Sequence, residues 1–296
     1  MTNYYNSLNL LLVGFQKKIA FVLFLLVFGI FGANAQMSTT VTMSGTPIAG
    51  SPFANLATAV TAINGLAITG PVVATSAAGT EINPAGGYAI TATGTSINTI
   101  VFQGSGVLGS VITAPSPAGT AGSLNDAIFK IIGGDFITIQ NYSMNENASN
   151  TTTAATTNNM VEWGVALLYA STTNGAQNCT IQNNTITLNR TYQNTFGIYS
   201  NSTHSSTTVG TIASATGTGG GNSGLRIYSN TIGNVNQGIV IVGPAAAADA
   251  NTGIEIGGAG LGNTITNFGT TSTFSTYANV STTTVMVSWL EILMDL

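Results

Sequence analysis

Four segments of the chain repeat one short pattern of apolar and polar positions. In the first three, an apolar residue stands two places before an isoleucine, and another apolar residue stands five places after it. A spacing of two puts side chains on one face of a strand, so each segment predicts a strand, a bend and a second strand facing the same way. The segments are FITIQNYSM (136–144), CTIQNNTI (179–186), LRIYSNTI (225–232) and IEIGGAGLGNTI (254–265).

Asparagine stands at equivalent positions in the predicted bends. Asn184 and Asn230 align there, and asparagine tolerates left-handed backbone angles. The aligned isoleucines Ile139, Ile181 and Ile227 are 42 and 46 residues apart (181 − 139 and 227 − 181). Repetition interrupted by low-complexity insertions such as NENASNTTTAATTNN is typical of stacked repeats. Further short strands are expected between the segments: VALLYAS (165–171), GIYSNS (197–202) and GIVIVGP (238–244).

A helix is predicted ahead of the repeats. Phe53, Leu56, Val60 and Ile63 have helical spacing, and Gly65 follows them, so residues 53–64 predict an amphipathic helix that caps the first repeat. Short apolar runs bounded by Gly, Pro or Ser come next and predict strands. Together these elements predict an all-β parallel β-helix with an N-terminal capping helix, and a β-sandwich is the alternative. The runs are PVVATSAAG, GYAITATG, NTIVFQGSG, SVITAPS and DAIFKIIGG.

The N-terminal segment has the pattern of an export signal. Lys17 and Lys18 precede the apolar run IAFVLFLLVFGIFGA, and the small residues of ANA follow. This pattern predicts a signal peptide over residues 1–35, with an unusual extension before the lysines and cleavage between Ala35 and Gln36. An uncleaved membrane anchor is the alternative, although a span needs about 20 apolar residues and this run is shorter.

Three further regions complete the predicted organisation. Residues 36–52 are expected to be a linker or the start of the mature chain, and residues 53–268 the parallel β-helix. Residues 269–296 lack the repeat and end in TTTVMVSWLEILMDL, a more apolar sequence. This atypical tail indicates a truncated or frameshifted end, in which case the last repeat has an open edge.

The amino-acid composition limits the classes of molecule that the chain is expected to bind. Charged residues make up 5% of the chain, against about 25% in an average protein. After the predicted cleavage, Lys130, Arg190 and Arg226 face nine carboxylates, giving 3 − 9 = −6. So few cations argue against binding to nucleic acid or anionic membranes. Cys179, the single cysteine, excludes an intrachain disulfide and is expected to be buried as a small apolar residue.

These segments resemble a known superfamily. The helix, the run VVATSAAGTEINPAGGYAITATGTSINTIVFQGSG, and the segments DFITIQNYSMNEN and NCTIQNNTI are similar to right-handed parallel β-helix, or pectate-lyase-like, proteins. The closest type is the Thr/Asn/Gly-rich secreted surface proteins of bacteria, which are adhesin-like. The resemblance covers roughly residues 50–268. It implies a right-handed parallel β-helix but says little about activity, because this fold hosts lyases, hydrolases, tailspikes and adhesins.

The sequence shows no clear catalytic motif. A lyase resembling this superfamily would need an Arg or Lys base with clustered acids, and a polygalacturonase-like hydrolase would need paired aspartates, a Gly-His-Gly and an Arg-x-Lys. The acids here are scattered, and the only histidine, His204, is expected to be solvated in a polar loop. No catalytic, cofactor-binding or metal-binding residue is therefore assigned. The acids of the repeat region are Glu81, Asp126, Asp135, Glu146, Glu162, Asp249 and Glu255.

Two positions remain the most suggestive of a sugar site. Glu162 precedes Trp163, a pairing common in sugar binding, and Arg190 follows a predicted strand. The alternative is a solvated charge at the rim beside a packing aromatic. Convergence of three or more charged residues in one groove would favour an enzyme, and their dispersal would favour a scaffold. The residues in question are Glu146, Glu162, Arg190, Arg226 and Asp249.

The sequence therefore predicts a secreted or cell-surface, adhesin-like structural module. We expect it to contact extracellular polysaccharide or neighbouring cells through polar loops and sheet faces, without catalysis or cofactor, and without nucleic-acid or membrane partners once the signal is cleaved. The alternative is a polysaccharide lyase or glycoside hydrolase. The pattern does not specify the ligand or the oligomeric state.

Overall fold

The computed structural model describes residues 35–119, 125–154, 157–205, 213–269 and 285–287. The chain divides into two compact units, residues 1–35 and 36–296, and every element described below belongs to the second. The predicted signal peptide, apart from Ala35, and most of the predicted atypical tail lie outside the described residues. No helix in the described part of the chain is long and apolar enough to cross a membrane.

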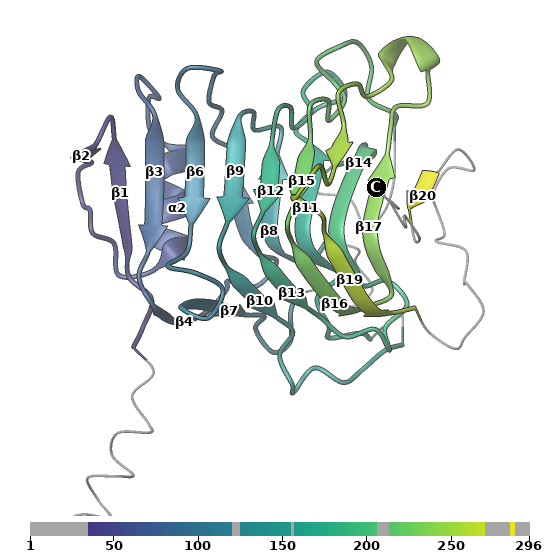
Figure 1. Ribbon diagram of the computed structural model, residues 1–296, viewed down its shortest axis with the longest axis horizontal. Helices are drawn as coiled ribbons and strands as arrows, with labels where there is room; N and C mark the ends of the chain where they lie inside the picture. Colours follow the sequence, from purple (N-terminus) through teal and green to yellow (C-terminus); the bar gives the residue numbers. More distant parts are fainter. Residues whose placement is uncertain (1–34, 120–124, 155–156, 206–212, 270–284, 288–296) are drawn as a thin grey trace, which may run out of the picture. The chain divides into compact units, whose positions relative to one another are not determined.

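The described strands form three sheets, and from β3 onward each sheet takes every third strand in succession (Figure 1). Sheet 1 has the order β18-β15-β12-β9-β6-β3-β1-β2, sheet 2 the order β19-β16-β13-β10-β7-β4, and sheet 3 the order β20-β17-β14-β11-β8-β5. Consecutive strands such as β9, β10 and β11 thus lie in three different sheets.

The strand bounds are as follows. In sheet 1 they are β1 Thr39–Met43, β2 Thr46–Pro47, β3 Val72–Ser76, β6 Ile100–Gln103, β9 Ile137–Gln140, β12 Thr180–Gln182, β15 Arg226–Tyr228 and β18 Glu255–Ile256. In sheet 2 they are β4 Gly79–Ile82, β7 Ser110–Thr113, β10 Ser143–Asn145, β13 Thr185–Thr187, β16 Thr231–Val235 and β19 Thr264–Phe268. In sheet 3 they are β5 Tyr88–Ile90, β8 Ala127–Ile132, β11 Trp163–Tyr169, β14 Phe196–Ser205, β17 Gln237–Val242 and β20 Val285–Val287.

The alignment of the four segments is confirmed by the strand register. Ile181 pairs with Ile139 on one side and with Ile227 on the other. Ile186 likewise pairs with Met144, and all of these side chains are fully buried. The apolar spacing therefore identified the inward positions correctly.

An asparagine ladder runs through the bends between sheets 1 and 2. Asn184 Oδ1 accepts from the Tyr142 amide at 3.1 Å, Asn230 Oδ1 accepts from the Asn184 amide at 3.1 Å, and Asn263 Oδ1 accepts from the Asn230 amide at 3.0 Å. The residue before Asn184, Asn183, has a positive φ of 55°. Each buried side chain satisfies backbone groups that the bend removes from the sheets.

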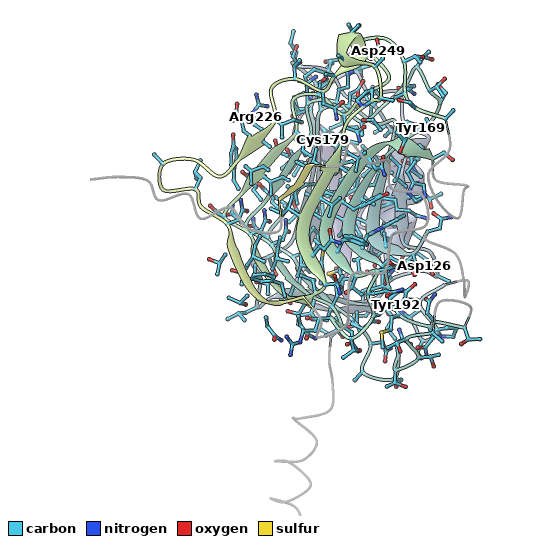
Figure 2. All side chains as sticks on the ribbon, turned by 90° about the vertical axis from the view of Figure 1, so that its right-hand side faces the viewer. Asp126, Tyr169, Cys179, Tyr192, Arg226 and Asp249 are labelled. Atoms are coloured by element: carbon cyan, nitrogen blue, oxygen red, sulfur yellow. The ribbon has the colours of Figure 1, made fainter. Side chains whose placement is uncertain are left out.

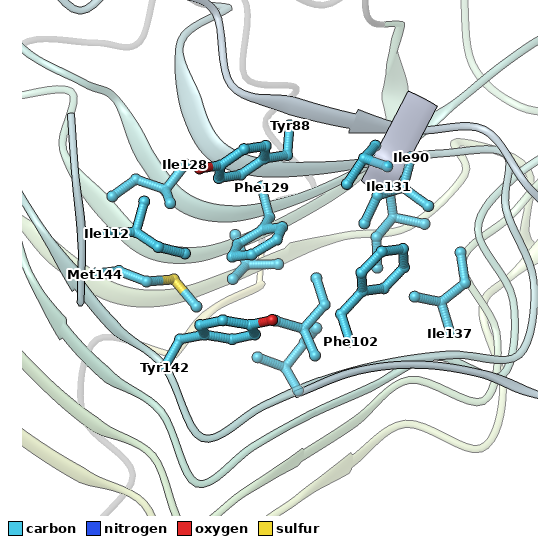
Figure 3. Close-up of a cluster of buried hydrophobic side chains, with 14 of the residues drawn as sticks. Tyr88, Ile90, Phe102, Ile112, Ile128, Phe129, Ile131, Ile137, Tyr142 and Met144 are labelled. Atoms are coloured by element: carbon cyan, nitrogen blue, oxygen red, sulfur yellow. The ribbon is translucent and has the colours of Figure 1, made fainter. Parts of the chain in front are cut away.

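The core lies between the three sheets (Figure 3). Phe129 packs between two tyrosines, with ring centroids 5.1 Å from Tyr88 and 5.5 Å from Tyr142. The Tyr142 hydroxyl is 2.9 Å from Ser76 Oγ, so its polar end is satisfied inside the core. Aliphatic residues from all three sheets fill the space around these rings.

The predicted right-handed parallel β-helix was wrong. The described residues form three separate sheets rich in parallel pairs, and no closed solenoid is found among them. Two of the sheets also contain antiparallel pairs: β1 with β2 and β3, and β17 with β20. The physical reason is that a spacing of two fixes which side chains share a face, whereas strand direction and partner are set by contacts between distant segments.

The N-terminal end of the three sheets, here called the covered end, is closed over by other elements. The helix α2 spans Leu56–Asn64 rather than 53–64, because Asn55 caps it by accepting from the Thr58 amide. Asn64 then bonds the backbone of the first strand of sheet 3, donating to the Ala89 carbonyl at 2.8 Å. Beyond α2, β1 and β2 extend sheet 1, in the region where the sequence predicts a linker or chain start.

The opposite end is here called the open end. Sheet 3 finishes with β20, whereas sheets 1 and 2 finish with β18 and β19, and no described strand pairs with the outer edge of either. Most of β19 is exposed, including Thr264, Thr266 and Phe268. The last inward isoleucines, such as Ile265, are only partly buried.

Candidate functional site

The outer face of sheet 1 carries amide side chains that hydrogen-bond to one another, here called the glutamine row. Gln182 Nε2 donates to Gln140 Oε1 at 2.6 Å, and Gln140 Nε2 donates to Gln103 Oε1 at 3.1 Å. Gln103 Nε2 then donates to Thr75 Oγ1 at 2.9 Å. These residues are neighbours in the strand register, so the row crosses the strands at steps of about 4.8 Å. The result is an uncharged, regularly spaced hydrogen-bonding surface.

Three side chains continue this face toward the open end, here called the Tyr228 cluster. Tyr228 is the register neighbour of Gln182, and Arg226 is the register neighbour of Glu255. Arg226 Nε lies 3.7 Å from Glu255 Oε2, and the Tyr228 hydroxyl donates to the same oxygen. That hydrogen bond is the main reason why the pKa of Tyr228 is raised. A partly exposed phenol ring beside amides can stack on a sugar ring while its neighbours bind hydroxyl groups.

A second group of charged residues, here called the acidic corner, lies where sheet 2 leads into sheet 3. Asp126 stands just before β8, Glu146 just after β10, and Glu162 just before β11. Burial raises the pKa of Glu146 and raises that of Glu162 well above its usual value, and the Asp126 charge adds to both shifts. Perturbed carboxyls of this kind occur at active sites and also in structural networks.

The hydrogen bonds of the acidic corner are structural. Glu146 accepts from the Asn147 amide at 2.8 Å, from Asn150 Nδ2 at 2.7 Å and from the Val161 amide at 2.8 Å. It thereby joins the two ends of the segment between β10 and β11. Glu162 Oε2 accepts from the Asp126 amide at 2.8 Å and so joins the starts of β8 and β11.

A cation accompanies these acids. Lys130 Nζ donates to the Asn125 carbonyl at 3.1 Å, and burial lowers the pKa of Lys130 while the charges of Asp126 and Glu162 oppose that shift. Glu162 is fully buried and Asp126 is 5% exposed. A polymeric substrate therefore cannot reach the Glu162 carboxyl without local opening of the loops.

The suggestive charged residues of the sequence do not meet in one place. Only Glu146 and Glu162 come together, whereas Arg190 is exposed in the turn after β13. In Figure 2, Arg226 and Asp249 lie in the upper part of the view and Asp126 lies in the lower right part. The geometry thus brings two of the five residues together and separates the others.

The expectations for Glu162 and Trp163 need correction. Trp163 is fully buried and stacks on Tyr199 with centroids 4.7 Å apart and planes 5° apart, so it offers no surface to a sugar. Glu162 is not a solvated rim charge either. The sequence around Trp163 could not show this, because the rings that pack on Trp163 are those of Tyr199 and His204 in a different strand, β14.

His204 is also not solvated. It lies in β14, which runs beyond the predicted GIYSNS strand, and it is fully buried. Its Nδ1 is 3.0 Å from the Tyr199 hydroxyl, and its ring meets Trp163 edge-on at 5.2 Å. It belongs to an aromatic cluster that packs on sheet 3.

The predicted burial of Cys179 is confirmed. Its side chain is fully buried, its Sγ lies 3.4 Å from the Gly134 carbonyl oxygen, and burial raises the pKa of the thiol to about 12. A thiol with such a pKa is unreactive near neutral pH.

The sequence reasoning missed the role of Glu81. Glu81 Oε2 accepts from the Leu56 amide at 2.9 Å, and Oε1 accepts from the Tyr88 hydroxyl at 2.8 Å. This carboxylate caps the first turn of α2, where unpaired amides favour a negative charge. An acid before a predicted strand carries no signal for a helix that precedes it by 25 residues.

No metal site emerges from the described residues. None of their His, Cys, Asp and Glu side chains form a group of three or more that could hold a metal ion.

The comparisons with known proteins give no further guide. No family model, no curated protein and no solved structure matches the chain significantly. Function must therefore be argued from the geometry of the surface itself.

Proposed function

We propose that the chain is an exported, cell-surface module that contacts glycans without catalysis. The observation that carries this proposal is the outer face of sheet 1, where the glutamine row continues into the Tyr228 cluster. Amide groups spaced at every strand suit an extended polymer of sugars with repeated hydroxyls, and each contact is individually weak. Binding strength then comes from many contacts made at once.

The export part of the proposal is supported by the sequence alone. Lys17 and Lys18, the apolar run and the ANA motif have the pattern of a signal peptide. The scarcity of charge favours an uncharged partner over a nucleic acid or an anionic lipid.

A panel of immobilised neutral and acidic polysaccharides tests the proposal with the purified chain. We expect Tyr228→Ala to weaken binding up to about tenfold, because an aromatic contact contributes about 0.5–1.5 kcal/mol. Tyr228→Phe keeps the ring and should bind nearly as the wild type. Thr187→Ala, on the exposed outer face of sheet 2, is the matched control. Equal binding by all four proteins would exclude the proposed face.

A polysaccharide lyase or glycoside hydrolase is the second candidate, favoured by the raised pKa values of Glu146 and Glu162 in the acidic corner. Against it, both carboxyls are engaged in holding loops together and Glu162 is fully buried. The same panel separates the two candidates. Release of unsaturated or reducing ends that Glu162→Gln abolishes would establish the enzyme and reject the non-catalytic module.

A further inference from the structure

A buried lysine contacts the side chain of an asparagine at the start of β8. Lys130 is 8% exposed and stands in the strand register between Ala89 of β5 and Ala166 of β11. These small neighbours leave room for the lysine side chain to lie along the sheet. Lys130 Nζ lies 3.1 Å from the Asn125 carbonyl oxygen and 3.3 Å from Asn125 Oδ1. The fold therefore holds the lysine nitrogen beside the side-chain amide of Asn125.

The surroundings of Lys130 favour its neutral form. Burial lowers the pKa of Lys130, and the charges of Asp126 and Glu162 oppose that shift only in part. A neutral lysine has a lone pair on Nζ, which is the form that attacks carbonyl carbons. The nearest side-chain carbonyl carbon is Cγ of Asn125, because Oδ1 is bonded to it.

A carboxyl group that can carry a proton lies next to this pair. Burial raises the pKa of Glu162 well above its usual value, and the Asp126 charge adds to the shift, whereas hydrogen bonds from the Asp126 and Asn125 backbone amides oppose it. Glu162 is thus adjacent to Asn125 in the acidic corner. Its Oε2 accepts from the Asp126 amide at 2.8 Å, whereas its buried Oε1 has no hydrogen-bond partner within the described part of the chain.

We propose that Lys130 and Asn125 become joined by an intramolecular isopeptide bond. Lys130 Nζ, as the neutral amine, attacks Cγ of Asn125, and the tetrahedral adduct then releases the side-chain nitrogen as ammonia. A bond from Nζ to Cγ forms, and the bond from Cγ to Nδ2 breaks. One hydrogen passes from Nζ to the leaving nitrogen, and the Glu162 carboxyl relays it. The reaction needs no other reactant, and the fold supplies the proximity that free side chains lack.

The bond acts locally, at the entry to β8. It fixes this entry beside the hydrogen bond from the Asp126 amide to Glu162, which joins the starts of β8 and β11. The closed loop contains only residues 125–130, so it restricts the unfolded chain little. The main consequence is therefore resistance of this corner to local opening.

Digestion of the denatured, purified chain with a lysine-specific protease tests the bond. Lys130 is the only lysine after the predicted cleavage site at Ala35. A free Lys130 allows cleavage after residue 130, whereas a linked Lys130 resists it. The intact mass should be lower than the sequence mass by one molecule of ammonia. Complete cleavage at Lys130 together with the full sequence mass would overturn the proposal.

Variants distinguish this bond from a cyclic imide at Asn125, which also releases ammonia. Lys130→Arg keeps the positive charge and should restore the full sequence mass. Asn125→Asp should form the same bond with loss of one water in place of ammonia. The control, Asn98→Asp in the turn before β6, should still lose one ammonia. A loss of ammonia that Lys130→Arg retains would overturn the proposal.

The role of Glu162 has its own readout. Glu162→Gln keeps the size of the side chain but cannot relay a proton. It should lower the fraction of linked chains at a given time after synthesis, measured by intact mass, while the circular dichroism spectrum stays that of the wild type. An unchanged linked fraction would remove Glu162 from the reaction.

Discussion

The covered end and the open end of the three sheets differ in how the outer backbone groups of their last strands are paired. Every sheet must end in a strand whose outer backbone groups need partners. At the covered end, β1 and β2 extend sheet 1 and α2 packs beyond sheet 3, and residues such as Leu56 and Ile63 are fully buried. At the open end, β18 and β19 keep free edges within the described part of the chain, and Ile265 is only partly buried. Substitutions at the covered end should therefore change the free energy of unfolding by a different amount from matched substitutions at the open end.

The largest expected effect comes from matched isoleucines at the two ends. Ile63→Ala removes a fully buried side chain at the covered end and should lower the free energy of unfolding by about 2–5 kcal/mol. Ile265→Ala, at the open end, should lower it by less than half as much, because solvent already reaches that position. Urea unfolding of both variants gives the comparison. Equal losses would mean that the open end is as well packed as the covered one.

The asparagine ladder gives the next contrast. Asn230→Ala leaves the Asn184 amide and the Ile181 carbonyl without these hydrogen-bond partners in a buried bend. The variant should lower the free energy of unfolding by about 1–3 kcal/mol. Asn263→Ala, the last ladder member, should cost less because water can replace its bonds. Thermal unfolding monitored by circular dichroism ranks the two. A larger loss for Asn263 would contradict the assignment of the open end.

Substitutions of one carboxylate at each end should change the free energy of unfolding by smaller amounts. Glu81→Gln weakens the acceptor at the first turn of α2 and should cost about 1–2 kcal/mol. Glu255→Gln removes the exposed ion pair with Arg226 and weakens the acceptor of the Tyr228 hydroxyl, and it should cost under about 1 kcal/mol because both contacts are open to solvent. Native-state hydrogen exchange of the α2 amides should increase for the first variant alone. If both variants accelerate exchange in α2, the two ends are coupled more strongly than the contacts indicate.

A change of pH should act on the acidic corner, which lies between the two ends. Glu162 has a raised pKa in the folded state, so the folded chain binds more protons than the unfolded one above about pH 4.3. Stability should then fall as pH rises toward the folded pKa, with a slope of at most about 1.4 kcal/mol per pH unit for this group. Glu162→Gln should flatten the slope in unfolding curves measured at several pH values. An unchanged slope would remove Glu162 as its source.

Local patterns predicted the inward residues well. The spacing around Ile139, Ile181 and Ile227 identified register neighbours that lie far apart in the chain, and Gly65 was identified correctly as the end of the helix. Both predictions depend on periodicity and turn chemistry, which a short window contains.

Predictions that depended on distant contacts failed. The right-handed parallel β-helix required a strand arrangement that local spacing does not specify, and the antiparallel pairs of β1 and β17 were not foreseen. His204 was expected to be solvated because it stands in a polar run, and Glu162 was expected either in a sugar site beside Trp163 or as a solvated rim charge. Their burial depends on contacts with other strands: Glu162 accepts from the Asp126 amide, and His204 packs on Trp163.

The asparagine ladder keeps the strand register independent of the number of residues in the connecting segments. Asn184 and Asn230 are 46 residues apart, and Asn230 and Asn263 are 33 apart, yet each pair is joined by the same side-chain bond. Connecting segments can thus gain or lose residues without moving the ladder. Foreign peptides inserted into those segments should therefore be held at positions fixed by the ladder. The molecule could serve as a scaffold that presents epitopes at a set spacing.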